Sequence, residues 1–204
     1  LLLIVIGFVT GVINTMAGGG SVLTLPILIF LGLPPNVANG TNRIAIFVQS
    51  LSTAAGFRSK EVKTFPFSLY FGFSALLGAI IGAKIAIDIA PEIFNRILAV
   101  VIVLVGLFLV IHKSNPSLFR EERLTGKYLW LSTIAFFFIG IYGGFIQAGT
   151  GLIMLIVLSG INHYALVKAN AIKNLVALVY NISALAIFIF SGKINWEYGL
   201  MLAV

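Results

Sequence analysis

The sequence predicts an all-α, polytopic membrane protein of two inverted repeats, each beginning with a helix that glycines interrupt. Composition is the first reason. The chain of 204 residues is 60% hydrophobic and only 9% charged, with a mean hydropathy of +1.11. Soluble domains carry roughly 25% charged residues. Several apolar runs also reach the ~20 residues that a membrane-spanning helix requires. The second reason is a glycine-rich interruption that occurs twice.

The first interruption is Asn-Thr-Met-Ala-Gly-Gly-Gly-Ser at residues 14–21, between the apolar runs 1–13 and 22–33. Three successive glycines disfavour a continuous helix, and Pro26 removes a backbone donor shortly afterwards. A helix broken at membrane depth is tolerated only where its backbone faces protein or a polar cavity. A glycine-rich packing face between helices is the alternative interpretation.

The second interruption occupies residues 140–151 and contains Gly149, Thr150 and Gly151. One spacing separates Gly18 from Gly149 and also Gly20 from Gly151. Interrupted apolar segments at corresponding positions of two halves indicate the binding site of a transporter. We therefore predict a first transmembrane repeat at residues 1–115 and a second at 128–204. The second is expected to be incomplete at its C-terminal end, because the chain stops inside an apolar run.

The other elements follow from apolar runs between polar loops. Residues 1–33 are too long for one upright crossing of a ~30 Å hydrocarbon core, so we expect a re-entrant hairpin or a strongly tilted broken span. Residues 128–158 should repeat this element. The expected spans are 44–57, beginning at the polar run 38–43, then 65–89, 93–111 and 169–190, with the start of another at 199–204.

The loops predict the orientation. Residues 58–63 and 113–127 carry three and four Lys or Arg, so both loops are expected on the cytoplasmic side. Residues 191–197 carry only Lys193, which favours the external side. These assignments leave three crossings between equivalent elements, and an odd number makes the repeats inverted.

Two cations follow the broken elements at equivalent places. Arg43 stands beside Asn42, and Lys173 stands beside Asn174, so each repeat offers one cation and one amide. With the backbone N–H groups of the breaks they would form an anion site. The alternative is that both cations extend to the interface as topology signals. The candidate substrate-binding residues are Asn14, Gly18, Gly19, Gly20, Asn42, Arg43, Gln147, Gly149, Thr150, Gly151, Lys173 and Asn174.

The Cys, acidic and basic residue content of the chain excludes several functions. The chain has no Cys, which excludes thiolate metal sites and disulfides. Its six acidic residues all lie in loops or near span ends, so no mid-span carboxylate is available as a proton carrier. We find no catalytic constellation and expect no metal or cofactor. The basic residues lie in short loops, so no nucleic-acid partner is expected.

Residues 11–20 with Pro26, then residues 32–41, resemble the sulfite exporter TauE/SafE family of the toluene sulfonate uptake permease superfamily. Residues 140–151 and 168–171 are similar to the C-terminal repeat of that family. The resemblance implies a transporter of about eight segments that handles sulfite, sulfonates or related organic anions. The family continues with small or apolar residues after Gly-Thr, whereas Asn42 and Arg43 follow here, and Ile172 and Lys173 stand at the equivalent place in the second repeat. The charges of Arg43 and Lys173 are expected to tune the substrate.

We therefore expect a multi-pass secondary transporter of sulfur-containing oxyanions or organosulfonates in a bacterial plasma membrane. Alternating access would rock one repeat against the other around a midplane site. The expected partners are the lipid bilayer and a small organic or inorganic sulfur anion, and oligomerisation remains open. A passive anion channel of the same fold is one alternative. An intramembrane enzyme is the other, disfavoured by the missing catalytic groups.

Overall fold

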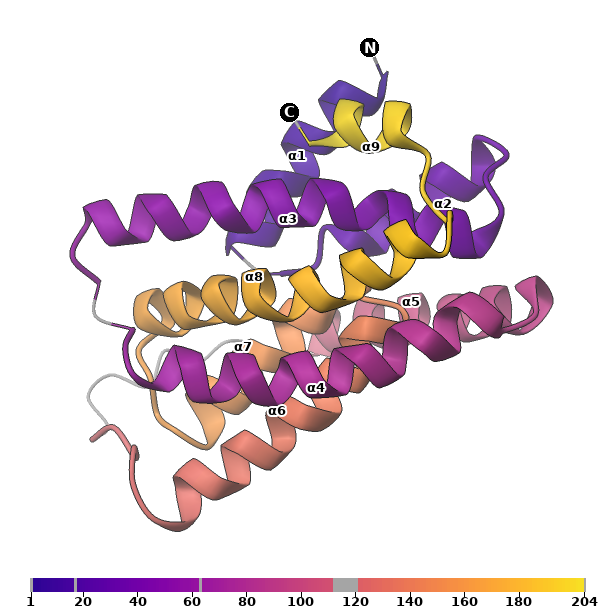
Figure 1. The fold of residues 1–204 in the computed structure, drawn as a ribbon. Helices are drawn as coiled ribbons and strands as arrows, with labels where there is room; N and C mark the ends of the chain where they lie inside the picture. The colour runs from indigo at the N-terminus through magenta and orange to yellow at the C-terminus, as the bar shows by residue number, and fades with distance from the viewer. Residues whose placement is uncertain (1, 17, 63, 112–120, 204) are drawn as a thin grey trace.

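The computed structural model describes residues 2–16, 18–62, 64–111 and 121–203. Within these ranges the chain is helical throughout and contains no strand, as predicted (Figure 1). The helices are α1 (Leu2–Met16), α2 (Ser21–Phe30), α3 (Pro35–Ser59), α4 (Phe67–Asp88), α5 (Pro91–Ile111), α6 (Lys127–Phe145), α7 (Thr150–Gly160), α8 (Leu166–Phe190) and α9 (Trp196–Leu202).

Both predicted interruptions are present. The first separates α1 from α2, where Gly18 has a φ of 78°. The second separates α6 from α7, where Gly149 has a φ of 72° and Gln147 one of 62°. Glycine reaches this left-handed region at little cost, whereas it strains most other residues. The breaks therefore follow directly from the local sequence.

The polar run 38–43 lies inside α3 rather than before it, which corrects the expected span boundary. The helix begins at Pro35, a residue favoured in the first helical turn because its missing N–H has no helical partner there. The polar side chains then find partners on other elements. Asn39 Nδ2, for example, donates to the carbonyl of Phe145 at 2.6 Å. Tertiary contacts thus allow a helix that begins earlier than hydropathy alone suggests.

The core is a stack of long helices in which α8 lies between α3 and α4, and α4 packs on α6 (Figure 1). Phe71 of α4 stacks on Phe136 of α6 with ring centroids 4.8 Å apart. Gly78 and Gly82 of α4 meet the backbone of α6 directly, since an added Cβ would collide with its carbonyl oxygens. These two glycines therefore let α4 and α6 pack closely.

Helices α3 and α8, each the long helix that follows a break, run antiparallel, side by side (Figure 1). The contacts show the direction. Asn195 N, just beyond α8, donates to Thr41 Oγ1 near the start of α3 at 2.9 Å. Further along α3, the Arg43 carbonyl accepts from Asn181 Nδ2 at 2.9 Å. As a result, the middle of each helix faces the middle of the other.

Three of the described helices are long and apolar enough to cross a membrane: Phe67–Asp88, Lys127–Phe145 and Leu166–Phe190. Shorter apolar helices occur at Leu2–Met16, Ser21–Phe30 and Thr150–Gly160. Many large apolar side chains face outward, among them Phe30 and Phe190, each 91% exposed. Apolar exposure on this scale is typical of a surface that contacts lipid.

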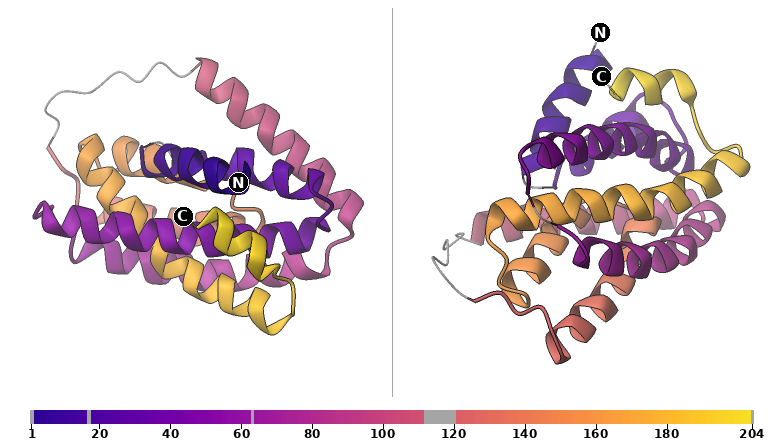
Figure 2. Two further views of the ribbon diagram at one scale, coloured as in Figure 1. Left: turned by 90° about the horizontal axis from the view of Figure 1, so that it is seen from above. Right: turned by 60° about the vertical axis from the view of Figure 1, so that its left-hand side comes forward.

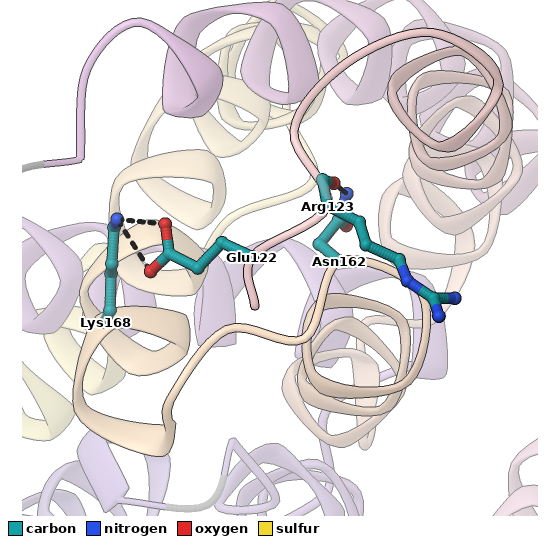
Figure 3. A network of polar contacts seen from close by, with 4 residues as sticks. All are labelled: Glu122, Arg123, Asn162 and Lys168. Atoms are coloured by element: carbon teal, nitrogen blue, oxygen red, sulfur yellow. Dashed lines mark hydrogen bonds and ion pairs between the residues drawn. The ribbon is translucent and has the colours of Figure 1, made fainter. Parts of the chain in front are cut away.

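A polar network lies where the segment before α6 meets the α7–α8 connection (Figure 3). Asn162 exchanges two hydrogen bonds with the backbone of Arg123, at 2.9 and 3.1 Å. Beside them, Lys168 Nζ pairs with the carboxylate of Glu122 at 2.7 Å. Burial raises the pKa of the nearby Tyr164 phenol, and the Glu122 carboxylate raises it further.

At the opposite part of the molecule, the two ends of the described chain lie close together, where α9 packs on α1 (Figure 2). The boundary predicted between the repeats falls in the loop 112–127, of which residues 112–120 lie outside the described residues. Lys63 of the loop 58–63 lies outside them as well. The division into repeats at these positions stays a prediction.

Candidate functional site: a cavity between the two helix breaks

The two glycine breaks touch each other. A Cβ added at Gly151 would lie 2.5 Å from the Cα of Gly18, and a Cβ added at Gly18 would collide with Gly151 in turn. Real side chains are not found at such separations, so only glycine fits at either position. The start of α7 is therefore pressed directly against the end of the α1 segment. This contact joins the two interrupted segments of the chain.

A cavity of about 40 Å³ lies beside this contact. Its walls come from both breaks and from the middles of α3 and α8. Seven of the twelve predicted site residues line it, namely Asn14, Gly18, Gln147, Thr150, Gly151, Lys173 and Asn174. The other lining residues are Ser21, Ile46, Ser50, Met154, Ala177 and Tyr180.

Lys173 is the basic side chain among the residues that line the cavity. Its side chain is 2% exposed, and Nζ donates to the carbonyls of Asn14 at 2.8 Å and Thr15 at 3.2 Å. The third acceptor is Asn170 Oδ1 at 2.8 Å, one turn earlier on α8. Carbonyls at a helix C-terminus have no helical donors and carry partial negative charge. Lys173 therefore caps α1 from the other repeat.

Gln147 brings a side-chain amide to the cavity wall. The residue is 2% exposed, and neither Oε1 nor Nε2 has a hydrogen-bond partner among the described residues. Its carbonyl, by contrast, accepts from Thr150 Oγ1 at 2.8 Å and from Ser21 Oγ at 3.3 Å. The backbone is thus held in a strained conformation while the side chain is left unpaired. An unpaired buried amide costs about 1–3 kcal/mol, which a ligand in the cavity would recover.

Asn14 and Asn174 are partly engaged by protein groups. Asn14 Oδ1 accepts from Gly20 N at 2.7 Å, and its Nδ2 donates to Gln49 Oε1 at 3.0 Å. Asn174 Nδ2 donates to the Asn170 carbonyl at 2.9 Å. Both side chains therefore help to hold the cavity wall in place.

Arg43 is not among the residues that line the cavity. It is fully buried at the end of α6, where its guanidinium donates to the carbonyls of Gly143, at 3.1 Å, and Gly144. The oxygen of Asn181 is a further acceptor at 3.4 Å. The ring of Phe188 lies 4.8 Å from the guanidinium carbon. The structure therefore does not bring the two predicted cations to one cavity.

Four other predicted residues also lie outside the lining. Asn42 accepts from Thr24 Oγ1 at 2.6 Å, between α2 and α3. A Cβ on Gly149 would meet Val105 of α5 at 2.8 Å. Gly20 contacts α1 closely, whereas Gly19 has room for a Cβ at ordinary distance.

The most distinctive residues that the sequence did not single out are Tyr180 and Ser50. Tyr180 is 2% exposed and shares the cavity with Lys173. Lys173, Ala177 and Tyr180 follow the spacing of one helix face, so a search along that face from Lys173 would have found the tyrosine. Ser50 has no such signal, because its position depends on how α3 meets α8.

The described residues contain no group of three or more His, Cys, Asp or Glu side chains placed to hold a metal ion. The cavity instead combines one ammonium, several amides and hydroxyls, and the N-terminal ends of α2 and α7. Helix N-termini carry partial positive charge. This combination suits a small anion with several oxygen atoms.

Comparison with known proteins shows the family of this chain. A model of the family described as sulfite exporter TauE/SafE matches residues 3–204. A probable membrane transporter protein of Haemophilus influenzae is 29% identical, over 98% of this chain and 78% of its own length. A relative in Sinorhizobium, ORF9, is 24% identical over 99% of this chain and 77% of its own length.

Escherichia coli YfcA, also a probable membrane transporter protein, is 27% identical over 98% of this chain and 73% of its own length. No solved structure matches the fold. The family match covers nearly the whole chain, including both glycine breaks and the cavity between them. The chain therefore belongs to the sulfite exporter TauE/SafE family of membrane transporters.

Proposed function

We propose that this protein is a secondary transporter that moves sulfur-containing oxyanions or organosulfonates across a bacterial plasma membrane. The observation that carries the proposal is the cavity between the breaks, where the Lys173 ammonium and the unpaired Gln147 amide face one space. A charged donor compensates the hydration that an anion loses on burial, and the amide donates to a further oxygen. The family name supports a sulfur oxyanion as the ligand.

The seven predicted residues that line the cavity are the proposed binding site, together with Tyr180 and Ser50. Arg43 takes a positioning role, because it does not line the cavity and its guanidinium donates to the end of α6. By holding Gly143 and Gly144, it fixes the helix that leads into Gln147. The aliphatic residues Ile46, Met154 and Ala177 would contact the apolar part of a sulfonate.

Alternating access around this cavity is the proposed mechanism. The two repeats meet at the cavity, and their equivalent helices α3 and α8 run antiparallel, as inverted repeats require. In this mechanism the helices around the cavity move apart first on one side of the membrane and then on the other.

The proposed topology has the loops 58–63 and 112–127 in the cytoplasm and 191–197 outside. Ser59 ends α3 and Ser191 follows α8, so the antiparallel arrangement puts them at opposite ends of the pair. Because the chain has no Cys, single cysteines at these two positions can be labelled selectively. Labelling of both from the same side of the membrane would contradict the inverted topology.

Flux in proteoliposomes tests the transport function. Sulfite, methanesulfonate, sulfate and chloride should be compared, and we expect saturable flux of sulfite or methanesulfonate with little chloride flux. Lys173→Gln should reduce the flux, while Lys168→Gln, which removes an exposed lysine of the same helix, is the matched control. Flux that rises linearly with anion concentration would indicate a channel. The absence of flux for every sulfur anion would refute the proposed function.

A further inference from the structure

We propose that Lys173 carries a proton that is transported together with the anion, so that the protein is an electroneutral proton–anion symporter. This proposal rests on the proposed anion transport and adds the coupling ion, for which the sequence alone showed no carrier. It assigns a proton-binding site to the Nζ atom of one lysine in the cavity.

The first argument is the set of groups around the ammonium. All three acceptors of Lys173 Nζ are neutral oxygens, two from the end of α1 and one from Asn170. A buried cation is usually paired with an anion. None of the six acidic side chains of the chain, all of which are described, lines the cavity or pairs with Lys173. An oxyanion in the cavity would be the missing counter-charge.

The second argument is that the neighbouring elements offer no better proton carrier. Helices α1, α2 and α7 contain no titratable side chain. Helix α3 contributes Arg43, held by the end of α6, and Arg58 at its far end; a guanidinium does not release its proton. On α8 the phenol of Tyr180 lines the cavity, while Lys168 pairs with Glu122 outside it. Lys173 is thus the amine that lines the cavity.

The third argument is the link between the proton and the helix contact. An ammonium has three donors, which match its three acceptors, whereas the free amine has two. Protonation therefore changes how firmly α8 holds the end of α1, which belongs to the other repeat. Because the proton and the anion each stabilise the bound state of the other, their affinities are reciprocally linked.

The transport cycle balances in charge. On the entry side the Lys173 amine takes one proton from water as the anion binds. On the other side the anion leaves and the proton returns to water, which restores the amine. The loaded site carries an ammonium and a monoanion, and the empty site a neutral amine. Neither form carries a net charge through the membrane, so neither has the large desolvation cost of an unpaired ion.

Proton uptake on anion binding is the direct test. Methanesulfonate is the first probe because it stays a monoanion at neutral pH, and sulfite is the second. Addition of methanesulfonate to the purified protein in weak buffer with a pH indicator should take up protons, up to one per bound anion. In proteoliposomes, an inward proton gradient should drive methanesulfonate accumulation, and a membrane potential alone should not.

Variants separate the coupling role from simple binding. Lys173→Arg keeps the charge but cannot give up its proton, so it should bind methanesulfonate within about tenfold of the wild type while losing proton uptake and gradient-driven accumulation. Lys168→Gln should retain both. Wild-type protein that binds and moves methanesulfonate without proton uptake from about pH 6 to pH 9 would refute the coupling alone. Proton uptake that survives Lys173→Arg would also refute it. If neither probe binds, the proposed function itself fails.

Discussion

Arg43 and Lys173 offer a comparison of two regions of the molecule. Each lies on the long helix that follows one broken element, and each donates to the end of the helix before the other break. Arg43 on α3 donates to the last carbonyls of α6, and Lys173 on α8 donates to the last carbonyls of α1. Both cations therefore satisfy the free carbonyls of a helix C-terminus. The arrangement is reciprocal.

The surroundings of the two cations differ. The guanidinium of Arg43 has several acceptors, lies beside the ring of Phe188 and is not among the residues that line the cavity. The ammonium of Lys173 lines the cavity with the unpaired Gln147. A planar, permanently charged group thus holds the end of α6, while a group able to release its proton lines the cavity. The following changes test this contrast.

The largest effect is expected where the breaks touch. Gly18→Ala and Gly151→Ala each introduce a Cβ that collides with the opposite backbone. Overpacking, added in Gly18→Ala to the strain of a positive φ, should destabilise the protein by roughly 4 kcal/mol. Yield of monodisperse protein and thermal unfolding in detergent measure this loss. Gly19→Ala is the matched control, since its Cβ would meet only Leu152 Cδ1 at 3.7 Å. Equal stability of Gly18→Ala and Gly19→Ala would contradict the described contact.

Arg43→Gln should have the second largest effect on stability. It leaves the carbonyls of Gly143 and Gly144 short of donors in a buried site, which should cost about 3 kcal/mol of stability. Thermal unfolding should show the loss, while the affinity of the folded fraction for methanesulfonate should fall less than in Lys173→Gln. A variant of normal stability but strongly reduced affinity would instead make Arg43 a ligand contact.

Lys173→Gln should weaken binding more than Arg43→Gln does, besides the stability lost with the donors to Asn14 and Thr15. The loss of a charge-assisted hydrogen bond corresponds to about 2 kcal/mol, or roughly a thirtyfold weaker affinity for the anion. Isothermal titration of the purified variant against methanesulfonate measures it. This affinity should be compared with that of Arg43→Gln, because Lys173→Gln is expected to lose more affinity for the anion than Arg43→Gln. An affinity equal to that of the wild type would remove Lys173 from the site.

Gln147→Leu should separate stability from binding. Its amide has no partner among the described residues, so an apolar side chain of similar size should stabilise the unliganded protein by about 1 kcal/mol. The affinity for the anion should fall about tenfold, because a donor is lost. A melting temperature that rises while the affinity for the anion falls supports the role of the Gln147 amide as a ligand contact. A fall in both would mean that the amide has a structural partner.

The smallest effect is expected at the exposed pair of Lys168 and Glu122 (Figure 3). Their side chains are 30% and 33% exposed, so solvent screens the attraction. Glu122→Gln should cost no more than about 0.5 kcal/mol, and the melting temperature should change by only about 1–2 °C. A shift of the size expected for Arg43→Gln would show that this network holds the repeats together.

Local properties of the sequence determined the class of the protein and the positions of its breaks. Hydropathy and charge predicted an all-helical membrane protein, and glycines with positive φ mark both interruptions, because backbone freedom belongs to the residue itself. The repeated spacing then indicated most of the cavity wall, including Gln147 and Lys173.

Only the tertiary structure decided which cation meets the cavity. Arg43 and Lys173 look equivalent along the chain, but their environments depend on side chains and backbone from the opposite repeat. The same reason applies to the contact of Gly18 with Gly151 and to Ser50 in the cavity wall. Such positions are set by the packing of segments far apart in sequence, which hydropathy and spacing do not record.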